Sequence, residues 1–487
     1  MPTVRGIQLP AATLLIGDSR IDRTGGGSYT QINPSTGEEL AEVTLATAAE
    51  VDQAVRAAND AQADWQSLLP TKRRDLIMAF ADLLDDHHEE MSVLRSVELG
   101  APKKQGKGLN MAVEYMRYFA GWVDKLEGST IPLGTSVLNY TVPEPYGTVA
   151  ALTPWNGGVV SATMKVVPAL VAGNCVVLKP SEVATLAPLR FGELALEAGI
   201  PSGVLNVIPG GVSAGEALVA HPGIDKISFT GSTTTARQVM AGAATNLTPV
   251  ILELGGKSAN IVFADADIDA AVMTTVFTAL AGMSGQGCVL PTRLLVEDSI
   301  YDQVEELTVA AAAALNVGRP FDPGVQAGPV ISEVSLDRIL DLISSATQRG
   351  DGTLLTGGHR LEGDLSSGFF VRPTVFGNVD NASPVARDEI FGPVISLIRF
   401  SDEADAIHVA NDSTYGLGGL VFTRDIARGH RVAAALEVGS VGINAFAPMP
   451  PSAPFGGVKH SGFGREGGLV GVREFVQDKN IYVDLST

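Results

Sequence analysis

The stretch TVAALTPWNGGVVSATMKVVPALVAGNCVVLKPSE, residues 148–182, places two short apolar segments, TVAAL and CVVL, on either side of a longer segment with helical character. The same alternation continues through VLNVI, KISF and PVILE, with a helical stretch between each pair. Strands that alternate with helices are typical of right-handed βαβ units, which build a parallel sheet with helices on both faces. The sequence therefore predicts an α/β fold.

The regions on either side of this stretch indicate further parts. A helical pattern runs from Thr47 to about Gly100. Residues 128–147 contain three prolines and alternate in polarity, which is typical of an exposed β-hairpin or arm. A second run of strands and helices spans about 256–460, so we place a domain boundary just after Glu253. The alternating tail EFVQDKNIYVDLS is a candidate to pair with the arm of the same or a neighbouring subunit.

Charge and composition exclude several classes of function. The formal net charge is -20, from 54 acidic against 34 basic residues, and it repels phosphate backbones, so nucleic acid is not an expected partner. Cys175 and Cys288 cannot form a disulfide framework, although one bridge between them stays open, and we expect a cytoplasmic protein. We expect no membrane partner and no metal site, because the apolar runs are short and the histidines are scattered.

Four polar tetrads follow the predicted strands: TPWN (153–156), KPSE (179–182), TGST (230–233) and ELGG (253–256). Ligands of open parallel sheets bind beyond the carboxyl ends of the strands, where helix N-termini point free N–H groups outward. Gly231 permits a close backbone approach and Ser232 can cap the next helix, which suits a pyrophosphate. Lys179 and Glu182 offer a donor and an acceptor for ribose hydroxyls. We therefore expect a nucleotide cofactor at this edge.

Two further motif matches point elsewhere. SGFGREGG has the glycine spacing of a dinucleotide fingerprint, but no apolar strand precedes it, and we interpret it as a turn-rich closing loop. GVSAG, residues 211–215, matches the nucleophile elbow of serine hydrolases, with Ser213 as the nucleophile. A serine hydrolase is therefore the alternative function, although a capped helix start explains the same residues.

Cys288, at the end of GMSGQGC, is the candidate nucleophile. A thiolate attacks an aldehyde, and the resulting oxyanion needs N–H donors, which Asn156 and the main-chain N–H of Cys288 can supply. The adduct then holds a hydride for an acceptor such as nicotinamide. Glu253 can activate the water that hydrolyses the thioester. Cys175, inside the segment CVVL, is interpreted as a small buried apolar residue.

The motifs TPWN, KPSE, FTGS, ELGGK, GQGC, EIFGPV and PFGGVKHSGFGRE, in this order and spacing, make the whole chain resemble the aldehyde dehydrogenase superfamily. The resemblance implies a Rossmann-like NAD-binding domain, an α/β catalytic domain and a small β oligomerisation arm, in dimers or tetramers. Its domains would be 1–126 with 148–255 for NAD, 256–460 for catalysis, and 127–147 with 461–487 for oligomerisation.

The resemblance also implies roles for single residues. Cys288 would be the nucleophile, Glu253 the general base and Asn156 an oxyanion donor. Retaining the base favours hydrolysis to the acid over transfer to coenzyme A, and the carboxylate of Glu182 favours NAD over NADP. The cofactor would be held by Thr153 and Trp155, by Lys179 and Glu182 at the adenosine ribose, by Gly231 and Ser232 at the pyrophosphate, and by Glu389 and Phe391 at the nicotinamide riboside.

The expected substrate pocket departs from the usual pattern. Many relatives carry a bulky aromatic residue after the oxyanion asparagine, whereas Gly157 and Gly158 follow it here. No arginine near the thiol, apart from Arg293 in the next strand, is placed to bind a distal carboxylate. We therefore expect a roomy, apolar pocket for aromatic, terpenoid or long aliphatic aldehydes. Its predicted lining is Gly157, Ser161, Met164, Phe446, Met449 and Phe455.

Overall fold

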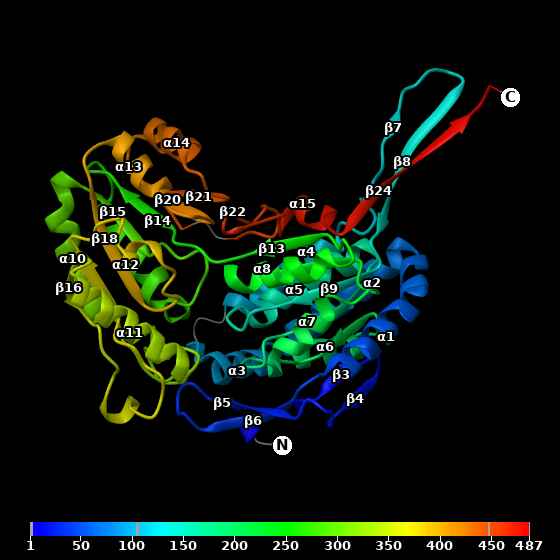
Figure 1. The fold of residues 1–487 in the computed structure, drawn as a ribbon, viewed down its shortest axis with the longest axis horizontal. Helices are drawn as coiled ribbons and strands as arrows, with labels where there is room; N and C mark the ends of the chain where they lie inside the picture. Colours follow the sequence, from blue (N-terminus) through cyan, green and yellow to red (C-terminus); the bar gives the residue numbers. More distant parts are fainter. Residues whose placement is uncertain (1–2, 104–106, 447–448, 487) are drawn as a thin grey trace.

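The computed structural model describes residues 3–103, 107–446 and 449–486. Two β-sheets with flanking helices form the body, and a β-arm projects from it beside the C-terminus (Figure 1). The predicted α/β class is confirmed, because the central strands of both sheets pair in parallel.

The first sheet has eight strands, and its five central strands are parallel. Every residue of TVAAL is buried, as expected for a parallel strand covered on both faces. Antiparallel strands at the two edges come from the chain termini, and the segment interpreted as a closing loop supplies one of them, β23. In spatial order the strands are β23 (Gly462–Phe463), β13 (Val250–Glu253), β12 (Lys226–Thr230), β9 (Thr148–Leu152), β10 (Cys175–Lys179), β11 (Leu205–Val207), β3 (Leu14–Ile16) and β4 (Ser19–Ile21).

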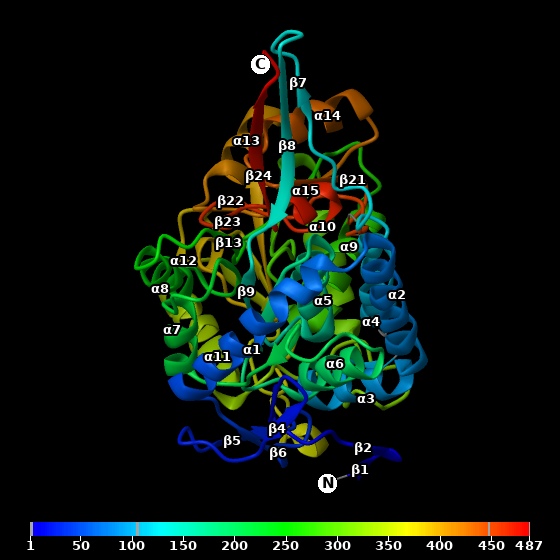
Figure 2. The ribbon, with the colours of Figure 1, turned by 90° about the vertical axis from the view of Figure 1, so that its right-hand side faces the viewer.

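Helices on both faces cover this sheet (Figure 2). The predicted helical pattern begins at Thr47, which caps the first helix in a capping box with Glu50, and ends at Gly100, which has a left-handed φ of 66°. The helices are α1 (Ala48–Ser67), α2 (Pro70–Asp86), α3 (His88–Leu99), α4 (Lys107–Ala120), α5 (Gly158–Ala172), α6 (Leu186–Glu197), α7 (Val212–Val219) and α8 (Thr233–Ala244).

The chain passes to the second, seven-stranded sheet between Glu253 and Ala259. In spatial order its strands are β16 (Thr353–Thr356), β17 (Thr374–Gly377), β18 (Val394–Phe400), β15 (Arg293–Glu297), β14 (Ala259–Val262), β20 (Gly418–Phe422) and β21 (Ser440–Ile443). Its helices are α9 (Ile268–Val276), α10 (Tyr301–Ala314), α11 (Glu333–Arg349), α12 (Pro384–Arg387), α13 (Glu403–Asn411) and α14 (Ile426–Ala435).

The helical stretch 268–285 is long and apolar enough to cross a membrane by length and composition. Half of it is buried, and Val272, Val276 and Leu280 pack in the core of the second sheet. This packing accounts for its apolar composition without a membrane.

The projecting arm joins distant parts of the chain. β8 (Val137–Pro145) pairs antiparallel with β24 (Val476–Asp484) over nine residue pairs, so the tail pairs with the arm of its own chain. The remaining short elements are β1 (Thr3–Val4), β2 (Ile7–Gln8), β5 (Ser28–Ile32), β6 (Glu39–Thr44), β7 (Thr130–Ile131), β19 (Tyr415–Gly416), β22 (Val458–Lys459) and α15 (Gly468–Arg473).

Candidate active site

The four polar tetrads lie at one edge of the first sheet. Leu152 is in register with Lys179 on one side and with Phe229 on the other, and Thr230 is in register with Glu253. The strands β9, β10, β12 and β13 therefore end at the same level, and the residues that follow them lie along one rim. This is the edge at which parallel sheets bind ligands.

The loop that carries Cys288 follows α9 and has an irregular backbone. Met283 and Ser284 adopt left-handed φ values of 47° and 54°, and Ser284 Oγ donates to the Gly328 carbonyl at 2.9 Å. Gln286 Oε1 accepts from the Ile331 N–H at 2.9 Å. These bonds anchor the loop to residues 328–331, and the free thiol of Cys288 is partly exposed.

Asn156 and the segment after Glu253 both approach this loop. Asn156 Nδ2 donates to the Gln286 carbonyl at 2.8 Å, two residues before the thiol. A Cβ atom on Gly256 would lie 2.3 Å from the Cys288 carbonyl oxygen, so only glycine permits this contact. The two sheets thus bring Asn156 and the Glu253 segment to the residues around Cys288.

Glu253 is buried with a relative exposure of 2%. Neither carboxyl oxygen has a hydrogen-bond partner among the described residues, and the site of a Cβ on Gly456 is 2.6 Å from Oε1. Burial raises the pKa of the Glu253 carboxyl well above its usual value, and the charge of Glu466 raises it further, against a lowering by Lys165. The protonated form of the Glu253 carboxyl is therefore favoured in the folded protein.

Lys165 and Glu466 form a buried ion pair whose charges act on Glu253. The sequence analysis did not predict this pair. Lys165 Nζ donates to Glu466 Oε1 at 2.6 Å and to Ser228 Oγ at 3.1 Å. The Lys165 and Glu466 side chains have relative exposures of 0% and 7%. A lysine in the middle of the apolar segment VVSATMKVVPALVA is a signal that could have found it, because a lone buried charge is costly.

The electrostatic surroundings of Cys288 favour the neutral thiol. Burial raises the pKa of the thiol to about 12, and the charges of Glu389 and Glu253 raise it further. A positive charge beside the sulfur would lower the pKa of the thiol and favour the thiolate.

Residues just before β18 of the second sheet face the rim of the first sheet. Glu389 Oε1 accepts from the Gly256 N–H at 3.1 Å. The rings of Phe391 and Trp155 meet edge to face, with centroids 5.4 Å apart, and Phe391 has a φ of 53°. Glu389 thus meets the tetrad that follows β13, and Phe391 meets the tetrad that follows β9.

The other predicted cofactor residues lie farther along the same rim. Ser232 caps α8 by accepting from the Thr235 N–H at 3.1 Å, and a Cβ on Gly231 would lie 2.4 Å from Cζ of the Phe229 ring. Lys179 Nζ donates to the Pro180 carbonyl at 3.4 Å, and burial lowers the pKa of this lysine while Glu182 raises it. The rim therefore offers Gly231, which has no room for a side chain, the capped N-terminus of α8, and Lys179, whose pKa is affected by the charge of Glu182.

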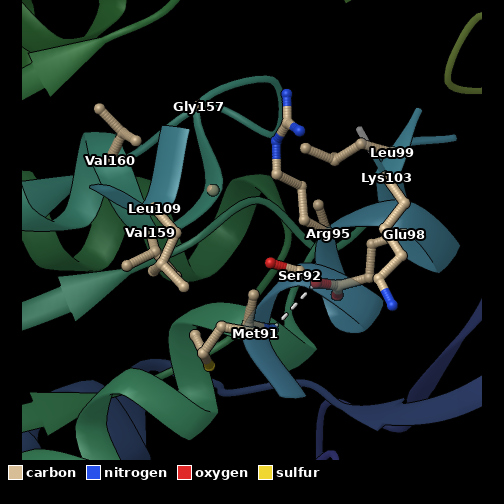
Figure 3. A pocket seen from close by; sticks show the side chains of 13 residues that line it. Met91, Ser92, Arg95, Glu98, Leu99, Lys103, Leu109, Gly157, Val159 and Val160 are labelled. Carbon is tan, nitrogen blue, oxygen red and sulfur yellow. Dashed lines mark hydrogen bonds between the residues drawn. The ribbon is translucent and has the colours of Figure 1, made fainter. Parts of the chain in front are cut away.

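The predicted pocket residues are divided between separate places. Phe446, Met449 and Phe455 line a cavity of about 540 Å³ with Tyr115 and with Val289, the neighbour of Cys288. The other predicted lining residues lie elsewhere: Gly157 lines a second cavity (Figure 3), while Ser161 and Met164 line neither, and Met164 belongs to the core of the first sheet.

Arg95 lies in the wall of the second cavity, together with Gly157. The sequence analysis considered arginines near Cys288 and in the loop 443–455, and Arg95 lies in neither place. No local signal marks it, because Arg95 is 62 positions from Gly157 along the chain and only the packing of α3 brings them together.

Ser213 is an exposed residue in the first turn of α7, and no hydrogen bond among the described residues joins it to a histidine. In the same residues, no group of three His, Cys, Asp or Glu side chains could hold a metal ion.

The fold and the site define an α/β protein with a thiol where two parallel-sheet domains meet. The model of the aldehyde dehydrogenase family matches residues 21–481. An aldehyde dehydrogenase of Enchytraeus buchholzi is 41% identical, over 99% of this chain and 98% of its own. Aldehyde dehydrogenase family 2 member B4, mitochondrial, of Arabidopsis thaliana is 39% identical, over 99% and 89%. The chain belongs to the aldehyde dehydrogenase family.

Solved structures agree with this assignment. A putative aldehyde dehydrogenase from Burkholderia cenocepacia has a TM-score of 0.96 and 38% identity, with 98% of each chain covered. PnpE from Pseudomonas sp. WBC-3, in complex with nicotinamide adenine dinucleotide, has a TM-score of 0.95 and 38% identity over the same shares. None of these likenesses supports the serine hydrolase alternative.

Proposed function

We propose that this protein oxidises an aldehyde to the carboxylic acid with NAD, through a covalent adduct on Cys288. The observation that carries this proposal is the convergence on the Cys288 loop of two segments that are distant in the sequence, 153–156 and 253–256. Asn156 donates a hydrogen bond to the Gln286 carbonyl, and Gly256 lies against the Cys288 carbonyl. Glu253 is the first residue of the tetrad that ends at Gly256.

Asn156 and Glu253 would act at different steps. The Cys288 thiolate forms a bond to the aldehyde carbon, and the carbonyl oxygen becomes an oxyanion. Asn156 Nδ2 carries two hydrogens, of which one goes to the Gln286 carbonyl, so the other can donate to the oxyanion with the Cys288 N–H. When bound, NAD supplies the hydride acceptor, and the aldehyde carbon is then held on sulfur as a thioester.

Hydrolysis completes the reaction at Glu253. Its carboxylate takes a proton from water, the water oxygen bonds to the thioester carbon, and the Cys288 thiolate leaves, releasing the acid. The absence of a hydrogen-bond partner on either Glu253 oxygen, within the described parts of the chain, favours this role. A base that already accepted strong bonds would bind water less readily.

The rim residues fit a dinucleotide. The buried hydroxyl of Thr153 has no hydrogen-bond partner among the described residues, and Gly231 leaves no room for a side chain beside the capped start of α8. Lys179 and Glu182 would hold the adenosine ribose, Gly231 and Ser232 the pyrophosphate, Glu389 and Phe391 the nicotinamide riboside, with Thr153 and Trp155 beside them. NAD is preferred to NADP, because the Glu182 carboxylate would repel a 2′-phosphate. The NAD complexes of PnpE and of betaine aldehyde dehydrogenase from Staphylococcus aureus support this assignment.

The reacting end of the substrate would lie in an apolar pocket. Phe446, Met449 and Phe455 surround the cavity beside Val289, and none of these four side chains is charged. Such a lining favours bulky apolar or aromatic aldehydes over small polar ones.

The domain roles and the assembly form part of the same proposal. Residues 1–126 and 148–255 would bind NAD, 256–460 would carry the thiol, and 127–147 with 461–487 would join subunits in a cytoplasmic dimer or tetramer. Exposed apolar side chains on the arm, such as Leu138, Tyr482 and Leu485, favour its burial against another subunit.

NADH absorbance on mixing the enzyme with NAD and an aldehyde tests the proposed function. Cys288→Ala should abolish the signal, whereas Cys175→Ala, the matched change at the other cysteine, should retain it. Ser213→Ala should also retain it, and NADP should give a much lower kcat/KM than NAD. Full NADH production by Cys288→Ala would refute the proposed mechanism.

A further inference from the structure

Glu389, the proposed partner of the nicotinamide ribose, lies between two carbonyl groups that basic side chains hold. Lys257 Nζ donates to the carbonyl of Asp388, the residue before it, at 2.7 Å. Arg338 Nη2 donates to the carbonyl of Ile390, the residue after it, at 2.6 Å. The main chain is therefore fixed by a side-chain hydrogen bond on each side of Glu389.

The two basic side chains come from different parts of the molecule. Lys257 belongs to the segment 254–258, along which the chain passes from the first sheet to the second (Figure 1). Arg293 Nε donates to the Lys257 carbonyl at 2.9 Å, so the main chain of the lysine is held as well. Arg338 lies at an exposed position of α11. The Glu389 segment is thus tied both to the segment between the sheets and to a helix of the second domain.

The Glu389 carboxyl itself is in close contact with the segment between the sheets. Its Oε1 accepts from the Gly256 N–H at 3.1 Å, and a Cβ on Gly255 would lie 2.1 Å from Oε2. The bond from Gly256 is the carboxyl's only hydrogen bond among the described residues. A carboxylate has about four acceptor sites, so it can still accept from the hydroxyls of a ribose.

Both cations act on the charge of this carboxyl. Burial raises the pKa of Glu389, and the charges of Lys257 and Arg338 lower it. Lys257 is only 3% exposed, and burial lowers its own pKa to about 7. An apolar side chain of similar length would avoid the cost of burying an amine, so the stability of the fold does not by itself account for a lysine here.

We infer that Lys257 and Arg338 are positioning residues for the cofactor. They hold the main chain on both sides of Glu389, so that its carboxylate faces the nicotinamide ribose, and they do so without touching the cofactor. This inference rests on the proposed use of NAD and adds two residues to that site.

Two nucleotides separate this role from general damage to the rim: NAD, and ADP, which has the adenosine and pyrophosphate of NAD but lacks the nicotinamide riboside. In calorimetric titrations of the full protein, Lys257→Met should raise the Kd for NAD about tenfold, because NAD loses a hydrogen bond to a charged group, and should leave the Kd for ADP unchanged. Arg338→Gln should give the same selective loss, and its exposed position leaves the core intact. Lys72→Met, at an exposed lysine of α2, is the matched control and should change neither Kd.

A double variant tests whether Lys257 acts through Glu389. Glu389→Gln removes the carboxylate, so adding Lys257→Met should change the Kd for NAD little further. Effects of the two substitutions that multiply would overturn the inference. Two other results would do the same: an NAD affinity like that of the wild type in both Lys257→Met and Arg338→Gln, or an equal loss of NAD and ADP. If the wild type binds ADP but not NAD, the proposed function itself fails, and this inference falls with it.

Discussion

Glu253→Gln should make the protein more stable than the wild type at high pH, by an amount that grows with pH. The substitution keeps the shape of the side chain and removes its ability to ionise. In the wild type the carboxyl is 2% exposed, without a hydrogen-bond partner among the described residues, and burial raises its pKa well above 4.5. Ionisation of Glu253 therefore weakens the folded state relative to the unfolded chain.

The sign and size of the effect follow from proton linkage. Below the ordinary pKa of 4.5 both states hold the proton, and the stabilising contribution of the raised pKa is complete. Between 4.5 and the raised pKa only the folded state holds it, so the wild type loses about 1.4 kcal/mol of unfolding free energy per pH unit. The glutamine variant loses nothing from this site, and the two stabilities diverge at that rate.

Urea unfolding of both proteins, from about pH 5 to about pH 8, measures the divergence. Glu306→Gln, the same change at an exposed position of α10, is the control and should follow the wild type. A constant difference between Glu253→Gln and the wild type across this range would refute the reasoning, because it would mean that Glu253 titrates as it does in the unfolded chain.

Two further predictions concern the same region. Lys165→Met should lower the unfolding free energy by about 3–5 kcal/mol in denaturant titrations, because it leaves the buried Glu466 carboxylate without its cation. The double variant Lys165→Met with Glu466→Met should recover most of this loss, and a double variant as unstable as the single one would contradict the prediction. The rate at which iodoacetamide alkylates Cys288 in the protein without NAD should be slow at neutral pH and rise about tenfold per pH unit, because the thiol pKa is about 12. Cys288→Ala serves as the blank, and an alkylation rate that does not depend on pH would contradict the prediction.

Much of the fold was predictable because its signals are local. The alternation of apolar segments and helical stretches after Thr148 predicted the parallel strands β9 to β13, and the fully buried pattern of TVAAL agrees with it. The edge strands were not predicted. β3, β4 and β23 are only two or three residues long, so no periodicity marks them. β3 and β23 join the sheet through partners far away in the sequence, and β4 joins it through β3.

Some residues of the candidate site could likewise be predicted from local patterns, and others could not. The tetrads were found because the ends of parallel strands meet at one edge, and the geometry brings Asn156 and Gly256 to the Cys288 loop. The partner of Lys165 was not found, because Glu466 is 301 positions away and neither residue carries a local signal for the other.

The sequence by itself determined the identity and order of the reactive groups: a thiol, an amide, a carboxyl and a rim of glycine-containing tetrads after apolar strands. Only the tertiary structure decided what state those groups are in. The raised pKa values of Glu253 and Cys288 come from burial and from charges brought close by other segments. The energy of an ionised group depends on its distance to solvent and to other charges in space, and these distances exist only once the chain has folded.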